Sequence, residues 1–129
     1  MISIKATGLT LALATMAAGY ASEAKADGDA EAGKQVFNRC RACHTLAEGA
    51  GNRVGPNLHG MFESEAGAKD GFNYSQAMKD SGITWNEETL DAYLKNPNGY
   101  IPGNRMPFPG LPNEKQRADL ITYLKQATQ

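Results

Sequence analysis

Cysteine and histidine are scarce in this chain, and their scarcity excludes several kinds of site. The 129 residues include two cysteines and two histidines, which are Cys40, Cys43, His44 and His59. Structural zinc takes four ligands, usually two cysteine pairs or one pair with two spaced histidines, and the spacing here does not match. A disulfide between Cys40 and Cys43 would close so short a loop that it would constrain very little of the chain. The two thiols therefore need another use.

Strand-like alternation is also missing, and so is a surplus of positive charge. No segment alternates apolar and polar residues convincingly, so we predict an all-α protein. A thioredoxin-like dithiol needs a strand before its motif and a parallel sheet around it, so the same absence argues against thiol redox chemistry. The 13 basic and 14 acidic side chains give a net charge of −1, which argues against a nucleic-acid-binding protein.

The one long apolar run lies at the start of the chain. Lys5 precedes apolar residues 9–19, and AKA at 24–26 is the small-x-small pattern that a signal peptidase reads. The run is shorter than the ~20 residues that span a bilayer. We therefore expect residues 1–26 to be a secretory signal peptide and residues 27–129 to form one soluble domain. Its compartment would be the periplasm, an oxidising space where two thiols do not stay free for long.

Three segments have the apolar spacing of amphipathic helices. Their expected N-caps are Asp29, Thr84 and Asn113, each a residue type whose side chain accepts backbone N–H bonds at a helix start. The second helix must stop before Pro97, because proline restricts the residue before it. A shorter helix is expected at residues 75–79. These four elements complete the predicted regular structure.

Two segments, residues 48–60 and 96–112, are dense in glycine, proline and asparagine and are predicted to be loops. Loops of this length are unusual in so small a domain unless they wrap around something. A chain of this size is also near the lower limit for a self-sufficient core, so a buried cofactor would help it to fold.

The two cysteines belong to the motif Cys-x-x-Cys-His, formed by Cys40, Cys43 and His44. This is the attachment motif of c-type haem. Two thiols about one turn apart can each add to one vinyl group on the same porphyrin edge, and the next residue turns its imidazole under the iron. After a signal peptide, and using every cysteine of the chain, the motif predicts one covalent haem c with His44 as an axial ligand.

The opposite face of the iron decides the function, because an open face allows gas binding or peroxide chemistry and a filled face favours electron transfer. His59 lies close to His44 in sequence and is expected to be a structural histidine on the same side. Met61 and Met78 are expected to pack in the core. Met106 lies in IPGNRMPFPG, where proline and glycine break every regular element. Local composition favours Met106 as the second ligand, with a packing role as the alternative.

The motif CRACH, the sequence GPNLHG and the segment GITWNEETLDAYLKNPNGYIPGNRM together resemble the class I c-type cytochromes, in particular short, mitochondrial-like bacterial cytochromes c. The resemblance runs from about residue 28 to the C-terminus. It implies a small cytochrome c fold, with three main helices, a short helix and long loops wrapped around a covalent haem. It also implies Met106 as the second ligand. The first and last helices would cross, with a contact formed by Gly33, Phe37, Leu120 and Tyr123.

The resemblance assigns roles to four further residues. The carbonyl of Pro56 would accept the other ring N–H of the ligating histidine and fix its orientation. Tyr93 would lie near the methionine sulfur. Tyr74 and Trp85 would bond a haem propionate, whereas the residues taken alone favour ordinary core aromatics.

The chain departs from the family pattern near the haem. Met78 stands where the family often has an asparagine, so a polar contact expected there is missing. Residues 63–65, Glu-Ser-Glu, occupy the loop where the family commonly has an arginine near a propionate, which should lower the potential unless Lys69 compensates. The lysine-rich rim is thinned, but four arginines are still expected around the haem edge: Arg39, Arg41, Arg53 and Arg105.

These features predict a one-electron carrier and not an enzyme. The family implies a membrane cytochrome bc complex as donor and a terminal oxidase or a photosynthetic reaction centre as acceptor, and a periplasmic dehydrogenase is another possible donor. We expect a monomer with no nucleic-acid partner. The alternative is a haem-based gas-binding or peroxidase-like protein whose methionine ligand is displaced, although no second histidine is placed for acid–base work.

Overall fold

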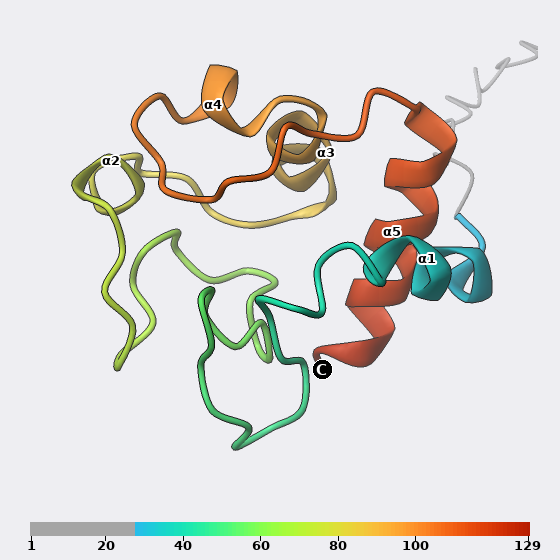
Figure 1. Cartoon of the computed structure of the whole chain (residues 1–129), viewed down its shortest axis with the longest axis horizontal. Helices are drawn as coiled ribbons and strands as arrows, with labels where there is room; N and C mark the ends of the chain where they lie inside the picture. Colours follow the sequence, from blue (N-terminus) through green and yellow to red (C-terminus); the bar gives the residue numbers. More distant parts are fainter. Residues whose placement is uncertain (1–27) are drawn as a thin grey trace, which may run out of the picture.

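The computed structural model describes residues 28–129, and the expected signal peptide lies outside the described residues. This part of the chain contains helices and no strand, apart from one isolated antiparallel bridge between Glu65 and Thr84. The helices are α1 (Ala30–Phe37), α2 (Gln76–Lys79), α3 (Glu87–Lys95), α4 (Pro97–Tyr100) and α5 (Glu114–Ala127) (Figure 1). The all-α prediction is therefore confirmed for the described residues. None of these helices has the length and apolar character that crossing a bilayer requires.

The first and last helices cross at a glycine, as the resemblance implied (Figure 1). A Cβ added to Gly33 would lie 1.9 Å from the carbonyl oxygen of Asp119 and 2.8 Å from Cβ of Tyr123. No other residue fits this approach without moving one helix. The rings of Phe37 and Tyr123 pack beside the crossing with centroids 5.7 Å apart, and Leu120 is buried beneath it.

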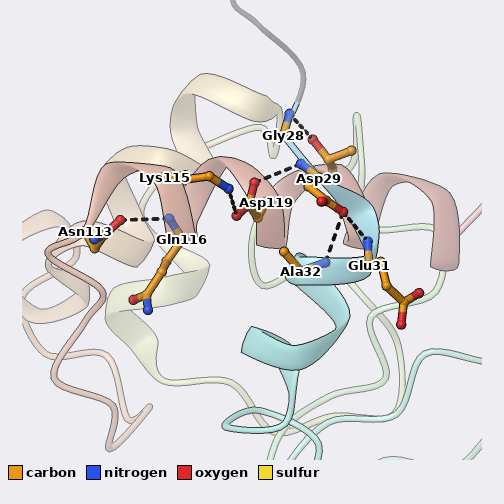
Figure 2. A network of polar contacts seen from close by, with 9 residues as sticks. Gly28, Asp29, Glu31, Ala32, Asn113, Lys115, Gln116 and Asp119 are labelled. Atoms are coloured by element: carbon orange, nitrogen blue, oxygen red, sulfur yellow. Dashed lines mark hydrogen bonds and ion pairs between the residues drawn. The ribbon is translucent and has the colours of Figure 1, made fainter.

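Polar contacts fix the start of α1 against α5 (Figure 2). The predicted N-cap Asp29 accepts the backbone N–H groups of Glu31 and Ala32, at 2.9 and 3.1 Å. The N–H of Asp29 in turn donates to the carboxylate of Asp119, at 2.8 Å. Lys115, one turn earlier on α5, donates to the other oxygen of that carboxylate, at 2.7 Å. The Lys115 ammonium, followed by the Asp29 N–H, lowers the pKa of Asp119 below its usual range.

The N-cap of α3 differs from the prediction. The structure places it at Asn86 and not at Thr84, because the side chain of Asn86 accepts the N–H of Thr89 while the Thr89 hydroxyl accepts the N–H of Asn86. This reciprocal pair satisfies two backbone donors that otherwise have no partner at a helix start. Thr84 instead lies in the isolated bridge with Glu65, and its carbonyl accepts the Thr89 hydroxyl.

Helix α4 lies inside the segment that composition predicted to be a loop. Pro97 occupies its first turn, where the missing N–H has no helical partner to lose, and the side chain of Asn96 caps Gly99. The prediction of a continuous loop over 96–112 is therefore wrong at Pro97–Tyr100, and four residues are too few for a periodic signal. Two other predictions hold: α3 ends before Pro97, and a short helix is present within residues 75–79, where Ser75 is the N-cap of α2.

One core joins α1, α3, α5 and the segment before α5. Its buried side chains are Phe37, Leu90, Leu94, Leu111, Leu120, Ile121 and Leu124. Arg117 is buried beside them, where its guanidinium bonds Asp91 of α3 and the carbonyls of Leu111 and Pro112. These bonds tie the chain that leads into α5 to the helices around it.

Candidate functional site

The Cys-x-x-Cys-His motif forms a tight turn directly after α1. The N–H groups of Cys43 and His44 both donate to the carbonyl of Cys40, at 3.0 Å each. Both cysteines are free thiols and half-buried. Burial raises the pKa of the Cys40 thiol, with Arg39 opposing the shift. A raised pKa keeps a thiol protonated, which is the opposite of a reactive redox cysteine.

The imidazole of His44 is fixed by the backbone of the following loop. Its Nδ1 lies 2.7 Å from the carbonyl oxygen of Pro56, and because a carbonyl only accepts, Nδ1 carries the proton. Nε2 is then the nitrogen with a lone pair. Burial lowers the pKa of His44, with the Pro56 carbonyl opposing the shift, so the neutral ring is favoured. The predicted pairing of Pro56 with His44 is therefore present in the structure.

Gly55 lets the loop pass against the face of that ring. A Cβ at Gly55 would lie 2.4 Å from Cε1 of His44 and 2.9 Å from its Nε2. The N–H of Gly55 donates to the carbonyl of Cys43, at 2.8 Å, which binds the loop to the motif itself. A larger residue at this position would push the ring out of place. The role of Gly55 was not predicted from the sequence.

A buried asparagine holds the loop that carries Pro56. The side chain of Asn57 donates to the carbonyls of Ala47 and Ala50, at 2.8 and 2.6 Å, and accepts the N–H of His59, at 2.7 Å. Asn57 is 5% exposed, so each of these bonds satisfies a group that has little access to water. The sequence offered one signal, an asparagine directly after Pro56 in GPNLHG, but nothing in it shows which carbonyls the side chain reaches.

Met106 lies on the segment between α4 and α5, and its sulfur is in contact with Tyr93 of α3. The Tyr93 hydroxyl donates to Sδ of Met106 at 3.8 Å, within the range of hydrogen bonds to sulfur. Burial raises the pKa of Tyr93 to about 12, so the hydroxyl keeps its proton at any physiological pH. The predicted proximity of Tyr93 to the methionine sulfur is therefore present in the structure.

Tyr74 and Trp85 are half-buried and each packs on another aromatic ring. Trp85 lies against Tyr93 with centroids 5.1 Å apart, and Tyr74 meets Phe72 edge-on at 4.9 Å. Within residues 28–129, the Trp85 ring N–H and the Tyr74 hydroxyl make no hydrogen bond to the protein. Two donors of this kind are available to a carboxylate of a bound molecule.

The donor set fits a covalent haem. Two thiols follow one helix at the spacing of the attachment motif, and a neutral imidazole beside them has one free ring nitrogen. A thioether from the segment between α4 and α5, drawn in orange in Figure 1, is held by a phenol of α3. Imidazole and thioether are the axial pair of c-type electron carriers. The described residues contain no cluster of three acidic, histidine or cysteine side chains that could hold a separate metal ion.

Comparison with known proteins agrees with this chemistry. The family model described as "Cytochrome c" matches residues 30–128. The chain is 52% identical over 103 residues to a cytochrome c from Stellaria longipes, an alignment that covers 79% of this chain and 95% of that protein. The chain belongs to the cytochrome c family. Cytochromes c from Ginkgo biloba and Cochliobolus lunatus are 50% and 51% identical to it over 102 residues each, and each alignment covers 78% of this chain. The same alignments cover 90% and 94% of those two proteins.

Membership in the cytochrome c family confirms the predicted cofactor and fold. The family binds one covalent haem c, and Cys40 and Cys43 fit its attachment motif. The helices without a sheet agree with the small all-α cytochrome c fold. The chain is therefore an electron carrier of the cytochrome c type.

The loop that departs from the cytochrome c pattern, and the lysine considered as its compensation, both bond the backbone. Ser64, in the loop where the family commonly has an arginine, donates its hydroxyl to the carbonyl of Met61. Lys69 donates to the carbonyls of Asn57 and His59, at 2.9 Å each, and so braces the loop behind Pro56. Lys69 was considered as a positive charge that could replace the missing arginine. In this structure its ammonium group bonds these two loop carbonyls.

The remaining methionines and the second histidine follow the predictions in part. Met61 packs against the core, as expected. Met78 is half-buried on α2 but is not among the side chains that contact that core, so its predicted core role is not confirmed. His59 is half-buried in the loop after Asn57, where its backbone bonds Asn57 and Lys69.

Proposed function

We propose that this chain is a periplasmic one-electron carrier, with a haem attached through Cys40 and Cys43 and ligated by His44 and Met106. One observation carries the proposal. Each of the two axial candidates has a protein partner and keeps a lone pair for a metal, on Nε2 of His44 and on Sδ of Met106. For His44 the partner is the Pro56 carbonyl, and for Met106 it is the Tyr93 hydroxyl.

These partners favour a stable six-coordinate centre. When bound, haem supplies a one-electron couple between Fe(II) and Fe(III). The Pro56 carbonyl orients the His44 ring and increases its basicity. The Tyr93 hydroxyl holds the soft Met106 sulfur, which favours the ferrous state. Both partners belong to fixed parts of the chain, the loop that Asn57 holds and helix α3. Little therefore needs to move when the charge changes.

Exposed arginines support a docking face for redox partners. Arg39 and Arg41 lie on the attachment motif, and Arg53 donates to the carbonyl of Arg41 at 3.2 Å. Arg105 precedes Met106 and donates to the carbonyl of Asn73, at 3.3 Å. Positive charge around a small contact area steers acidic partners into brief encounters.

The finer setting follows from the family resemblance and from the first residues. The donor is a membrane cytochrome bc complex or a periplasmic dehydrogenase, and the acceptor is a terminal oxidase or a photosynthetic reaction centre. The carrier acts as a monomer and has no enzymatic activity of its own. The periplasmic location is supported by the signal-like residues 1–26 and not by the relatives named above, which come from plants and a fungus.

A visible spectrum with carbon monoxide tests the axial assignment. The oxidised haem-loaded protein should show sulfur-to-iron charge transfer, and its reduced form should not bind carbon monoxide at neutral pH. Met106→Ala should lose the charge-transfer band, bind carbon monoxide and have a lower reduction potential. Met61→Ala is the matched control, because it removes a thioether that packs against the core, and should keep all three properties.

Two results would contradict the assignment. If the wild-type protein binds carbon monoxide readily, the gas-binding or peroxidase-like alternative gains support. If Met106→Ala leaves the potential and the spectrum unchanged, another residue occupies the second axial position. If acidified organic solvent extracts the pigment from the purified protein, the haem is not covalently attached.

A further inference from the structure

The side chain of Asn104 joins helix α4 to the backbone of Met106. Its amide nitrogen lies 3.0 Å from the carbonyl oxygen of Pro97 and 2.9 Å from that of Ile101. A third oxygen, Oδ1 of Asn98, is 3.2 Å away. On the other side, Oδ1 of Asn104 accepts the N–H of Met106, at 3.0 Å. One half-buried amide thus uses both of its ends to link two parts of the chain.

This arrangement fixes the orientation of the amide. Three oxygens surround the nitrogen of Asn104, and an N–H group faces its oxygen. The flipped orientation would place the amide oxygen against those three oxygens and the NH₂ group against an N–H. Only the observed orientation satisfies the groups on both sides.

The link matters because little else holds the backbone at Met106. Gly103 has a φ of +88°, and Pro107 has no N–H to donate. The N–H of Asn104 donates to the carbonyl of Ile101, and the Arg105 side chain donates to that of Asn73. Within residues 28–129, the N–H of Arg105 makes no hydrogen bond, so the bond to Asn104 is what anchors the N–H of Met106 itself. The sulfur of Met106 is held separately by Tyr93, from α3.

The hydrogen bonds from Asn104 to α4 and its C-cap also contribute to the fold. Helix α4 has four residues, too few to be stable on its own. Asn104 adds side-chain N–H donors to the carbonyls of Pro97, the first residue of the helix, and Ile101, its C-cap, which also accept the backbone N–H groups of Ile101 and Asn104. The position of Met106 is thereby coupled to a helix whose start is capped by Asn96.

We propose that Asn104 is a positioning residue that holds Met106 ready for ligation and so sets how easily an external ligand displaces it. The inference rests on the proposed axial role of Met106. Displacing the thioether requires the segment around Met106 to move, which breaks the bond between its N–H and Asn104. Loss of that bond raises the population of the displaced form, and the apparent affinity for a competing ligand rises by the same factor.

Imidazole binding to the oxidised, haem-loaded protein measures this factor. Asn104→Ala removes both ends of the link and should raise the apparent imidazole affinity about tenfold, the change expected from about 1.4 kcal/mol. Asn104→Asp keeps an acceptor of the same shape but loses the donors to α4, and should also raise the affinity. Asn96→Ala is the matched control, because it removes the cap of α4 without touching the amide of Met106, and should change the affinity less than twofold.

A second measurement uses the wild-type protein and does not depend on a variant that folds. Hydrogen exchange should show the Met106 amide protected at least about tenfold more than the neighbouring Arg105 amide. In Asn104→Ala this difference should disappear. Equal exchange of the two amides in the wild-type protein would overturn the proposal.

The outcomes separate this inference from the proposed function. If the oxidised wild-type protein lacks sulfur-to-iron charge transfer, the axial role of Met106 fails first. If the band is present but Asn104→Ala leaves the imidazole affinity within twofold, only the role of Asn104 is wrong. If Asn96→Ala raises the affinity as much as Asn104→Ala does, the effect is a general loosening of α4, and the specific link is refuted.

Discussion

The crossing of α1 and α5 and the loops that carry His44 and Met106 are held together by different forces. At the crossing, backbone lies directly against backbone at Gly33, with apolar side chains packed around it. In the loops, side-chain amides reach backbone carbonyls: Asn57 does so behind Pro56, and Asn104 does so behind Met106. Packing fixes the frame, and a buried and a half-buried side-chain amide fix the loops of the two candidate ligands.

The difference has a consequence for how each region tolerates change. A tightly packed crossing fails when volume is added, because the helices cannot separate without exposing the core. A loop tethered by hydrogen bonds fails when one partner is removed, because the remaining groups stay buried and unpaired. The two regions should therefore respond to opposite kinds of substitution.

Adding one methyl group at the crossing should have the largest effect. In Gly33→Ala the new Cβ would lie 1.9 Å from the Asp119 carbonyl oxygen, so α1 and α5 must move apart. We expect a loss of at least about 3 kcal/mol in the free energy of unfolding. Denaturant unfolding of the haem-loaded protein, followed by circular dichroism, measures it. Gln35→Ala, on the exposed side of α1, is the control and should change stability by less than about 0.5 kcal/mol.

Truncating the loop tether should have the next largest effect. Asn57→Ala removes three hydrogen bonds and leaves the Ala47 and Ala50 carbonyls without that partner, so we expect a loss of about 2–3 kcal/mol. Because the tether holds Pro56 beside His44, the reduction potential should shift as well. Gly33→Ala, in contrast, should lower stability without a comparable shift in the protein that remains folded.

The exposed neighbour Asn52 provides the control for the loop. Its side chain also bonds the backbone, accepting the N–H of Asn57 at 2.8 Å and donating to the carbonyl of Gly71 at 3.0 Å, but it is open to water. Asn52→Ala should therefore cost less than about 1 kcal/mol, since water replaces the lost partner. Equal losses for the two variants would show that burial of Asn57 is not what makes the tether strong.

The two regions also differed in how far the sequence predicted them. The crossing was implied by the family resemblance, and the N-caps Asp29 and Asn113 are where side-chain chemistry places them. The two axial candidates and their partners Pro56 and Tyr93 were assigned by motif and resemblance, and the structure brings each pair together. Contacts of this kind can be predicted from residues that are close in sequence or from a motif that the family shares.

The tethers could not be predicted in the same way. Asn57 and Asn104 stand in glycine- and proline-rich segments, where any asparagine is explained equally well by a turn. Their function depends on which carbonyls the folded loop brings within reach. The start of α3 was misplaced for a related reason. Both Thr84 and Asn86 are good N-caps, and the structure decides between them: Asn86 and Thr89 cap each other, and Thr84 pairs with Glu65.

A charge effect at the crossing should be smaller than the effects of Gly33→Ala and Asn57→Ala, and it depends on pH. Lys115 and the N–H of Asp29 lower the pKa of Asp119 in the folded state, so its ionised form stabilises folding above the ordinary carboxyl pKa of about 3.9. This contribution is lost as the pH falls through the lower, folded-state pKa. Asp119→Asn should therefore be less stable than wild type at pH 7, and the difference should shrink below about pH 4.

The free energies of unfolding of Asp119→Asn and wild type, measured between pH 7 and pH 2, give this difference. Glu114→Gln, an exposed carboxylate on the first turn of the same helix, is the matched control. It removes a carboxylate of α5 but keeps the contacts of Asp119 with Lys115 and the Asp29 N–H, so its effect at pH 7 should be smaller than that of Asp119→Asn. An Asp119→Asn difference that grows as the pH falls would show that the sign of the coupling is wrong.

The smallest expected effect concerns backbone strain at Glu63, in the loop before α2, and contrasts with the packing at the crossing. Glu63 is the non-glycine residue with a left-handed backbone among those described, at φ 63°, where its N–H donates to the carbonyl of Trp85. This conformation costs a side-chain-bearing residue about 1–2 kcal/mol, and glycine loses about 0.4–1 kcal/mol through a freer unfolded chain. Glu63→Gly should therefore raise stability by about 0.5 kcal/mol. Glu65→Gly, with the same change in charge at an ordinary φ, should lower it by a similar amount, and equal signs for the two would rule out the strain.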